Sequence, residues 1–167
     1  MKIDTPRLMI CDFTPDMARA VHLGSLDADM RSFLPDEVFE TEEIAAEVIA
    51  DLTECAASGE GPFVHPCLLQ DGTYVGYVQF APAEGGYEVG YHIVAAHTGR
   101  GYATEALTAF LPVMMARLQL TQVLGICDAR NVASIRVLEK CDFRPVFTGD
   151  APYQGTIRPI VKMIFSI

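Results

Sequence analysis

Hydrophobic residues recur at helical spacing in part of the N-terminal third and in short runs along the rest of the chain. Within residues 41–59, Ile44, Val48 and Leu52 recur every fourth residue, which predicts a helix with one apolar face. A shorter helix is predicted over residues 14–23, because a threonine followed by a proline there is typical of a helix start. The N-terminal third is therefore expected to supply two helices.

Runs rich in β-branched and aromatic residues predict the strands of a sheet. We expect strands at residues 7–13, 63–70, 73–80, 87–94, 122–127, 143–147 and 156–165. An Asp71-Gly72 pair between the second and third runs favours a hairpin. Two further helices are predicted, one over residues 101–118, where Pro112 is expected to cause a kink, and one that Asn131 caps. This order predicts one α/β domain over all 167 residues, without repeats or long linkers.

The composition predicts a folded protein without disulfides, metal sites or membrane spans. Half of the residues are apolar and the mean hydropathy is +0.23, which argues against disorder. The five cysteines form no CxxC pair and the four histidines lack ligand spacing, so we expect reduced thiols and no metal. The start of the chain lacks a signal-peptide core, and the longest apolar run is too short to cross a bilayer. We therefore expect a soluble, cytoplasmic protein.

Acidic side chains are concentrated at the start of the chain. Residues 1–60 hold fourteen acidic and four basic side chains, and the remainder hold eight of each, so the first segment carries the whole net charge of −10. Nucleic acid is excluded as a partner, because phosphate contacts need clustered lysine and arginine. The acidic segment would attract a cationic ligand through its summed field. The alternative is a solvated acidic face that only aids solubility.

A glycine-flanked arginine stands directly before one of the predicted helices. Gly99, Arg100 and Gly101 precede the helix over residues 101–118, so several backbone N–H groups are expected at the positive end of a helix dipole. Side chains at the two glycine positions would hold a pyrophosphate away from the backbone. The pattern predicts a phosphate-binding loop. A dinucleotide dehydrogenase is excluded, since Thr104 occupies the third glycine position of that fingerprint.

Five motifs in order along the chain are typical of one enzyme family. They are residues 5–8 (TPRL), 33–35 (FLP), 88–91 (EVGY), 99–107 (GRGYATEAL) and 131–143 (NVASIRVLEKCDF). With the predicted order of elements, they make the chain resemble the GNAT superfamily of N-acetyltransferases, and within it the Rim-type branch that acetylates ribosomal-protein N-termini. The resemblance implies an α/β (α+β) GNAT-like domain: a mixed, mostly antiparallel twisted sheet of about six to seven strands flanked by about four helices.

The resemblance also implies that acetyl-CoA is the co-substrate. Its binding is expected at Ile93, Val94, Gly99, Arg100, Gly101, Tyr102, Ala103, Thr104, Asn131 and Ser134. In the family the loop amides hold the pyrophosphate, and the strand before the loop, here at Ile93 and Val94, pairs with the pantetheine arm. Other interpretations remain open for three of these residues. Asn131 is also a good helix cap, Ser134 can bond back to a helix carbonyl, and Arg100 can be a solvated cation.

Amide formation from an amine and a thioester needs a base, an oxyanion donor and an acid. The resemblance places Glu88 beside the thioester as a proton relay, although a strand glutamate can also face solvent or brace a neighbouring strand. A backbone N–H near Ile93 or Val94 is the expected oxyanion donor. Leu138 stands where many relatives have the tyrosine that protonates the thiolate, so Ser134 or a water molecule is expected to act instead.

Two hypotheses on function follow. The first is an acetyl-CoA-dependent N-acetyltransferase that acts on a primary amine of a small molecule or a protein N-terminus, by direct attack in a ternary complex. The alternative is a non-catalytic acyl-CoA-binding or regulatory module, supported only by the departures at Thr98 and Leu138. Asp142 also departs from the family, where a glycine is usual after a helix end.

The acceptor is expected between the first two helices, the hairpin and the final strands. His65 is a candidate for lining its pocket. We expect a monomer or homodimer that binds neither nucleic acid nor membranes.

Overall fold

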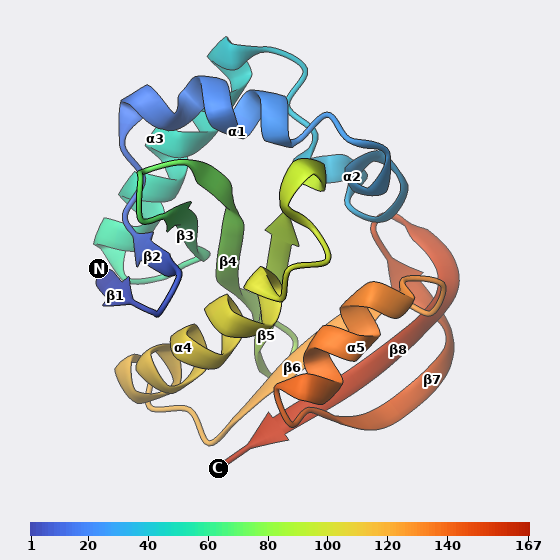
Figure 1. Cartoon of the computed structure of the whole chain (residues 1–167). Helices are drawn as coiled ribbons and strands as arrows, with labels where there is room; N and C mark the ends of the chain where they lie inside the picture. Colours follow the sequence, from blue (N-terminus) through green and yellow to red (C-terminus); the bar gives the residue numbers. More distant parts are fainter.

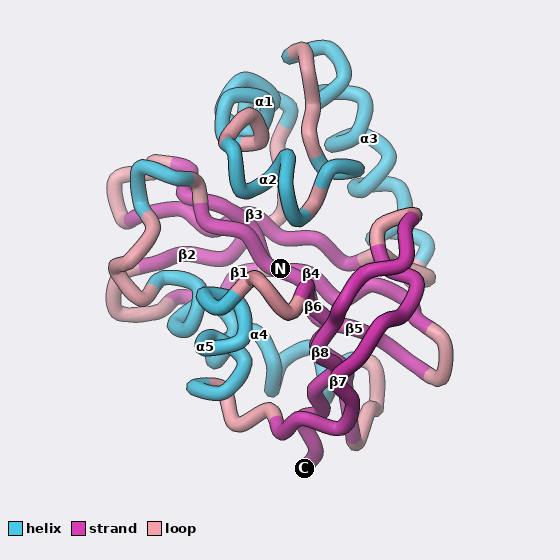
Figure 2. Tube along the Cα trace, turned by 90° about the vertical axis from the view of Figure 1, so that its right-hand side faces the viewer, coloured by secondary structure: helices cyan, strands magenta, loops and turns pink.

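A central sheet separates the five helices into two layers. The strands of the computed structural model, which describes residues 1–167, are β1 (Lys2–Asp4), β2 (Leu8–Cys11), β3 (Phe63–Leu69), β4 (Tyr74–Ala83), β5 (Gly86–Ile93), β6 (Gln122–Asp128), β7 (Arg144–Tyr153) and β8 (Thr156–Ser166). The helices are α1 (Ala18–Gly24), α2 (Ala28–Phe33), α3 (Glu42–Ser58), α4 (Tyr102–Arg117) and α5 (Val132–Lys140). Helices α1, α2 and α3 cover one face of the sheet, and α4 and α5 cover the other (Figure 1, Figure 2).

The strands follow the order β1-β2-β3-β4-β5-β6-β8-β7, and every neighbouring pair except β5–β6 is antiparallel. This confirms the expected α/β fold with a mixed, mostly antiparallel sheet. The structure has one strand and one helix more than the sequence pattern predicted, namely β1 and α2. Both are too short to show a hydrophobic period. The Asp27 side chain caps α2 by accepting from the Met30 N–H at 2.9 Å.

Two helix ends differ in detail from the sequence-based expectation. The first helix opens with a 3-10 turn over Pro15–Met17, and the Thr14 side chain makes no cap hydrogen bond there. Pro112 lies inside α4, which continues to its end at Arg117. No helix has both the length and the apolar character that crossing a membrane would require.

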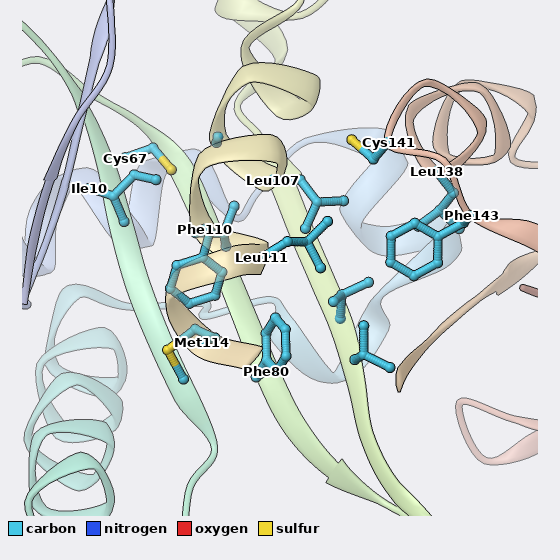
Figure 3. Close-up of a cluster of buried hydrophobic side chains, with 14 of the residues drawn as sticks. Ile10, Cys67, Phe80, Leu107, Phe110, Leu111, Met114, Leu138, Cys141 and Phe143 are labelled. Atoms are coloured by element: carbon cyan, nitrogen blue, oxygen red, sulfur yellow. The ribbon is translucent and has the colours of Figure 1, made fainter. Parts of the chain in front are cut away.

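Helix α4 contributes one side of the main hydrophobic core. Leu107, Phe110 and Met114 are fully buried, and the Phe110 ring meets the Phe80 ring of β4 edge-on with centroids 5.6 Å apart. Figure 3 shows these side chains between α4 and the strands beneath it. Burying each such side chain contributes roughly 1.5–3 kcal/mol. The core therefore fixes α4, and with it the loop before α4, against the centre of the sheet.

The parallel strands β5 and β6 are paired over a short distance only. Their register contains Glu88 opposite Leu124 and Val89 opposite Gly125. Beyond Val89, β5 continues to Ile93 paired with β4 alone, while β6 continues paired with β8. Backbone groups on the free edge of β5 therefore face a gap between the two strands, because strand amides point alternately to the two sides.

Candidate functional site

Two adjoining cavities lie at the gap between β5 and β6, which the start of α5 borders. The larger has a volume of about 230 Å³ and the smaller about 70 Å³. Both cavities are lined by Phe33, Leu34, Tyr91, Asn131 and Ser134. The predicted positions Ile93, Gly99, Gly101, Tyr102, Ala103 and Thr104 line the larger cavity, and Glu88 lines the smaller. The structure therefore brings together candidate residues from three separate motifs.

The glycine loop presents free backbone donors to the larger cavity. Gly99 and Gly101 have φ angles of +73° and +81°, which side chains rarely adopt. The first backbone N–H that bonds within α4 is that of Glu105, which donates to the Gly101 carbonyl at 3.0 Å. The N–H groups from Gly101 to Thr104 have no acceptor within the protein and lie at the positive end of the helix. This arrangement suits a phosphate or pyrophosphate.

Arg100 and Val94 are the two predicted positions that line neither cavity. The exposed Arg100 guanidinium donates to the Ala96 carbonyl at 3.4 Å. The Val94 N–H donates to the Val75 carbonyl at 3.0 Å, so it is not free to bind a thioester. Since alternate amides point to opposite sides of a strand, the Ile93 N–H faces the gap. Ile93 is therefore the better placed oxyanion donor of the pair.

Asn131 and Ser134 form the start of α5 on the other side of the gap. The Asn131 Oδ1 atom accepts from the Ser134 N–H at 3.1 Å, so the capping role is present. The Asn131 amide nitrogen makes no hydrogen bond within the protein, and the residue lines both cavities. Capping fixes the side chain while leaving its donor free for a ligand.

Tyr91 is a site residue that sequence reasoning did not single out. Its hydroxyl lies 2.8 Å from the Ser134 carbonyl oxygen and 2.9 Å from the Ser134 Oγ. Burial raises the pKa of Tyr91, so its hydroxyl is protonated at neutral pH. The sequence feature that could have identified Tyr91 is its place in the 88–91 motif, two residues before Ile93 on the same free edge of β5. Tyr91 and Ser134 thus form a pair of hydroxyls in the gap.

Leu138, at the position where relatives carry a tyrosine, belongs to the core. It is 1% exposed, and a Cβ added to Gly125 would lie 2.7 Å from its Cδ2 atom. The absence of a side chain at Gly125 therefore leaves room for a branched residue at this turn of α5. The hydroxyl that Leu138 lacks has a counterpart nearby in Tyr91, on the facing strand.

A buried carboxylate holds the turn that leads into α5. Asp128 is 1% exposed, accepts from the Arg130 N–H at 2.9 Å, and pairs with the Arg130 guanidinium at 2.6 Å. These hydrogen bonds to Arg130 lower the pKa of Asp128 to about 2. The Asn131 N–H donates to the Asp128 carbonyl at 2.9 Å, so the same turn sets the position of the cap.

Glu88 is one of the two β5 residues paired on both sides, directly before Val89, where this double pairing ends. Desolvation raises the pKa of Glu88, opposed by the charge of Lys162. A second carboxylate that the sequence did not reveal, Glu37, lines the same smaller cavity. Burial raises the pKa of Glu37 to about 7, and Gln79 donates to its Oε1 atom at 3.5 Å. Glu37 follows the 33–35 motif in a 3-10 turn, which periodicity does not detect.

The histidines have different surroundings. His92 Nε2 lies 3.0 Å from Asp27 Oδ2, and His92 lines the larger cavity. His65 was expected to line an acceptor pocket, and it lines neither of these two cavities. Its ring is 2% exposed, packs edge-on against Phe110, and contacts the Cys11 carbonyl at 3.0 Å. Its position in β3 directs it to the face that α4 covers. No group of three or more His, Cys, Asp or Glu residues is arranged to hold a metal ion.

Comparison with known proteins gives a family match over most of the chain. The model of the acetyltransferase (GNAT) domain matches residues 7–144. The uncharacterized N-acetyltransferase YnaD of Bacillus subtilis (strain 168) is 28% identical over 147 residues, which is 86% of this chain and 83% of YnaD.

Solved structures resemble the whole chain. A GNAT-family acetyltransferase from Bacillus anthracis is 25% identical with a TM-score of 0.85, covering 99% of this chain and 98% of the other. RimL, a ribosomal L7/L12 alpha-N-protein acetyltransferase solved with coenzyme A, has a TM-score of 0.87 at 18% identity, covering 100% and 98% of the two chains. The Rim-type resemblance is therefore confirmed in the fold.

Proposed function

Because this chain belongs to the GNAT acetyltransferase family, we propose that it transfers an acetyl group from acetyl-CoA to a primary amine by direct attack in a ternary complex. The observation that carries the proposal is the gap between β5 and β6, with unpaired backbone donors at one end and a carboxylate at the other. Holding both substrates in this gap supplies most of the rate, since positioning is the largest entropic gain.

The donor is held by groups on both sides of the gap. The free N–H groups from Gly101 to Thr104 bind the pyrophosphate, and the free edge of β5 at Ile93 pairs with the pantetheine arm. The Asn131 amide nitrogen supplies a further donor. Together these contacts place the thioester near the point where the two strands separate.

The chemical step uses groups that the structure gathers at that point. Glu88 accepts a proton from the ammonium group of the acceptor, directly or through water, and the resulting free amine attacks the thioester. Its raised pKa makes Glu88 a stronger base than an exposed glutamate. The Ile93 N–H holds the oxygen that becomes negative. The Tyr91 and Ser134 hydroxyls, 2.9 Å apart, donate a proton to the departing thiolate. This pair replaces the tyrosine that Leu138 does not provide.

Acetyl-CoA binding and turnover are measured separately. Titration calorimetry is expected to show 1:1 binding, and release of free thiol is expected with at least one primary amine. Binding without thiol release from any amine would favour a non-catalytic acyl-CoA-binding module. No binding would overturn the proposal.

An Ala103→Asp variant tests the phosphate loop. A carboxylate in the first turn stabilises a helix but repels a pyrophosphate at the same N–H groups. We expect acetyl-CoA binding to be lost while the melting temperature stays equal or rises. Ala103→Asn is the matched uncharged control, with a side chain of similar size. Equal affinity in the two variants would argue against pyrophosphate at this loop.

The amine that accepts the acetyl group belongs to a protein N-terminus or to a small molecule. RimL is named for acetylating a protein α-amino group, and that supports a protein N-terminus. A third cavity, on the side of the sheet that α1 and α3 cover, bears on this choice.

A further inference from the structure

A third cavity lies on the side of the sheet that α1 and α3 cover. Its volume is about 240 Å³. Its walls are formed mainly by apolar side chains, among them Val21 of α1, Val48, Ile49 and Leu52 of α3, and Val64 of β3. By comparison, a cavity of roughly 150 Å³ lined by such residues holds a benzene ring. The space is therefore large enough for an aryl or branched alkyl group.

This apolar cavity adjoins the two cavities of the acetyl-transfer site. Met30 and His92 line it together with the larger cavity of that site, and Glu37, Tyr77 and Gln79 line it together with the smaller one. A ligand in the apolar cavity would thus meet these five residues before it reached the gap. Its polar end would face Glu37 and Tyr77.

The polar groups at this junction are suited to an ammonium ion. Tyr77 is 8% exposed, and its hydroxyl has no hydrogen-bond partner within the protein. The Glu37 carboxylate has one contact, the Gln79 amide at 3.5 Å. The Gln79 side chain lies across Gly90 of β5, where an added Cβ would be 2.5 Å from its Nε2 atom. A half-buried carboxylate with one long contact and a buried hydroxyl without a partner both gain from a positively charged donor.

The number of charges in the cavity limits the ligand. Glu37 is the half-buried carboxylate at the junction, and Asp36 is exposed at the rim. Asp27 is already paired with His92. A second ammonium group carried into the apolar part would be desolvated without a partner, which costs several kcal/mol. One charge and one apolar group fit the site, whereas a polycation does not.

Resting on the proposed acetyl transfer, we infer that the acceptor is a monoamine with an aryl or branched alkyl substituent, held with its amine at Glu37 and Tyr77 and its apolar group in the third cavity. The amine then lies on the side of β5 that carries Glu88 and His92, since alternate side chains share a face. This places the nucleophile next to the base. It also accounts for part of the acidic N-terminal segment, because Glu37 belongs to it.

The inference is tested by comparing acceptors in the thiol-release assay. We expect 2-phenylethylamine and 3-methylbutylamine to exceed ethylamine and spermidine by roughly 10- to 100-fold in kcat/KM, the range that burial of such a group supplies. A peptide with N-terminal phenylalanine shows whether a polypeptide can supply the same amine. Equal or better use of spermidine or ethylamine would overturn the inference while leaving acetyl transfer intact. Failure of every amine would overturn both.

Two tryptophan variants of α3 locate the effect in the cavity. Leu52→Trp fills the space, and we expect the preference for 2-phenylethylamine over ethylamine to disappear. Ala50→Trp places the same side chain on the exposed side of α3 and should leave the preference unchanged. The chain has no native tryptophan, so blue-shifted emission shows that the new ring is buried in the folded protein. Leu52→Ala enlarges the cavity and should favour bulkier amines. An unchanged preference in a folded Leu52→Trp protein would contradict the inference.

Discussion

Arg7 and Glu105, 98 residues apart in the sequence, join the segment between β1 and β2 to the first turn of α4. The Arg7 Nε atom donates to Glu105 Oε2 at 2.6 Å, and the Arg7 backbone N–H donates to Oε1 at 2.9 Å. The same guanidinium donates to the Arg100 carbonyl at 2.8 Å and lies 4.7 Å from the centre of the Tyr102 ring. The 5–8 motif thus acts on the phosphate loop without forming part of it.

Replacing Arg7 is therefore expected to weaken acetyl-CoA binding by disordering the loop. Arg7→Ala should raise the dissociation constant about 3- to 10-fold, a modest change because the ion pair is half exposed. Arg7→Lys should behave similarly, since one ammonium cannot reach both Glu105 and the Arg100 carbonyl. Titration calorimetry measures the dissociation constant for acetyl-CoA in both variants. Arg31→Ala removes an equally exposed arginine from a pair with Glu40 and should leave the affinity unchanged. A similar loss in that control would remove the loop-specific explanation.

Tyr91 and Ser134 are expected to act as one unit. If both hydroxyls deliver the proton to the thiolate, Ser134→Ala and Tyr91→Phe should each lower kcat by about 10- to 100-fold. The double variant should lose little more than either single one, because groups in one relay are not additive. The KM for acetyl-CoA should stay near the wild-type value. Steady-state kinetics of the wild type, the two single variants and the double variant complete this double-mutant cycle. Independent, multiplying losses would indicate separate roles.

Glu88→Gln is expected to change the pH profile. If Glu88 removes the proton of the charged amine in the wild type, activity should fall with decreasing pH as Glu88 becomes protonated. The variant must wait for the amine to lose its proton in solution. The turnover of the variant should be about 100-fold or more below that of the wild type near neutral pH. The difference should shrink as the pH approaches about 10, where free amine is abundant. Acetyl-CoA affinity should not change. A constant ratio of rates across pH would leave Glu88 as a structural residue.

Most of the fold could be predicted from the sequence, because its signals are local. Gly99 and Gly101 adopt positive φ angles, and Asp142 has a φ of +65° at the helix end where glycine is usual in the family. The groups that were missed depend on contacts between distant segments. Glu37 joins the site through a 3-10 turn, and Tyr91 meets Ser134 only because β5 and β6 separate.

The orientation of His65 toward Phe110 has the same origin. Sequence alternation shows that β3 has two faces, but it does not show which of them α4 covers. Leu138, which stands where many relatives have the tyrosine that protonates the thiolate, likewise lies in the core, because Gly125 of β6 leaves space for it. Side-chain direction relative to the layers is a tertiary property.

Glu37 offers a test in which function and stability are opposed. Its pKa is raised by burial to about 7, from an ordinary value of 4.5, so the folded state binds its proton more tightly than the unfolded state. Between these values the folded protein carries more protons, and the free energy of unfolding must therefore fall as the pH rises. The loss between pH 4.5 and pH 7 amounts to about 3 kcal/mol for this group alone.

Glu37→Gln should remove that part of the pH dependence. Urea unfolding at a series of pH values from about 5 to about 8.5 measures it, and we expect the variant to be the more stable protein at the alkaline end. The same substitution should raise the KM for the amine, because the ammonium ion loses its carboxylate, while the affinity for acetyl-CoA stays constant. A variant less stable than the wild type at alkaline pH would show that Glu37 is held by favourable contacts and does not await a cationic ligand.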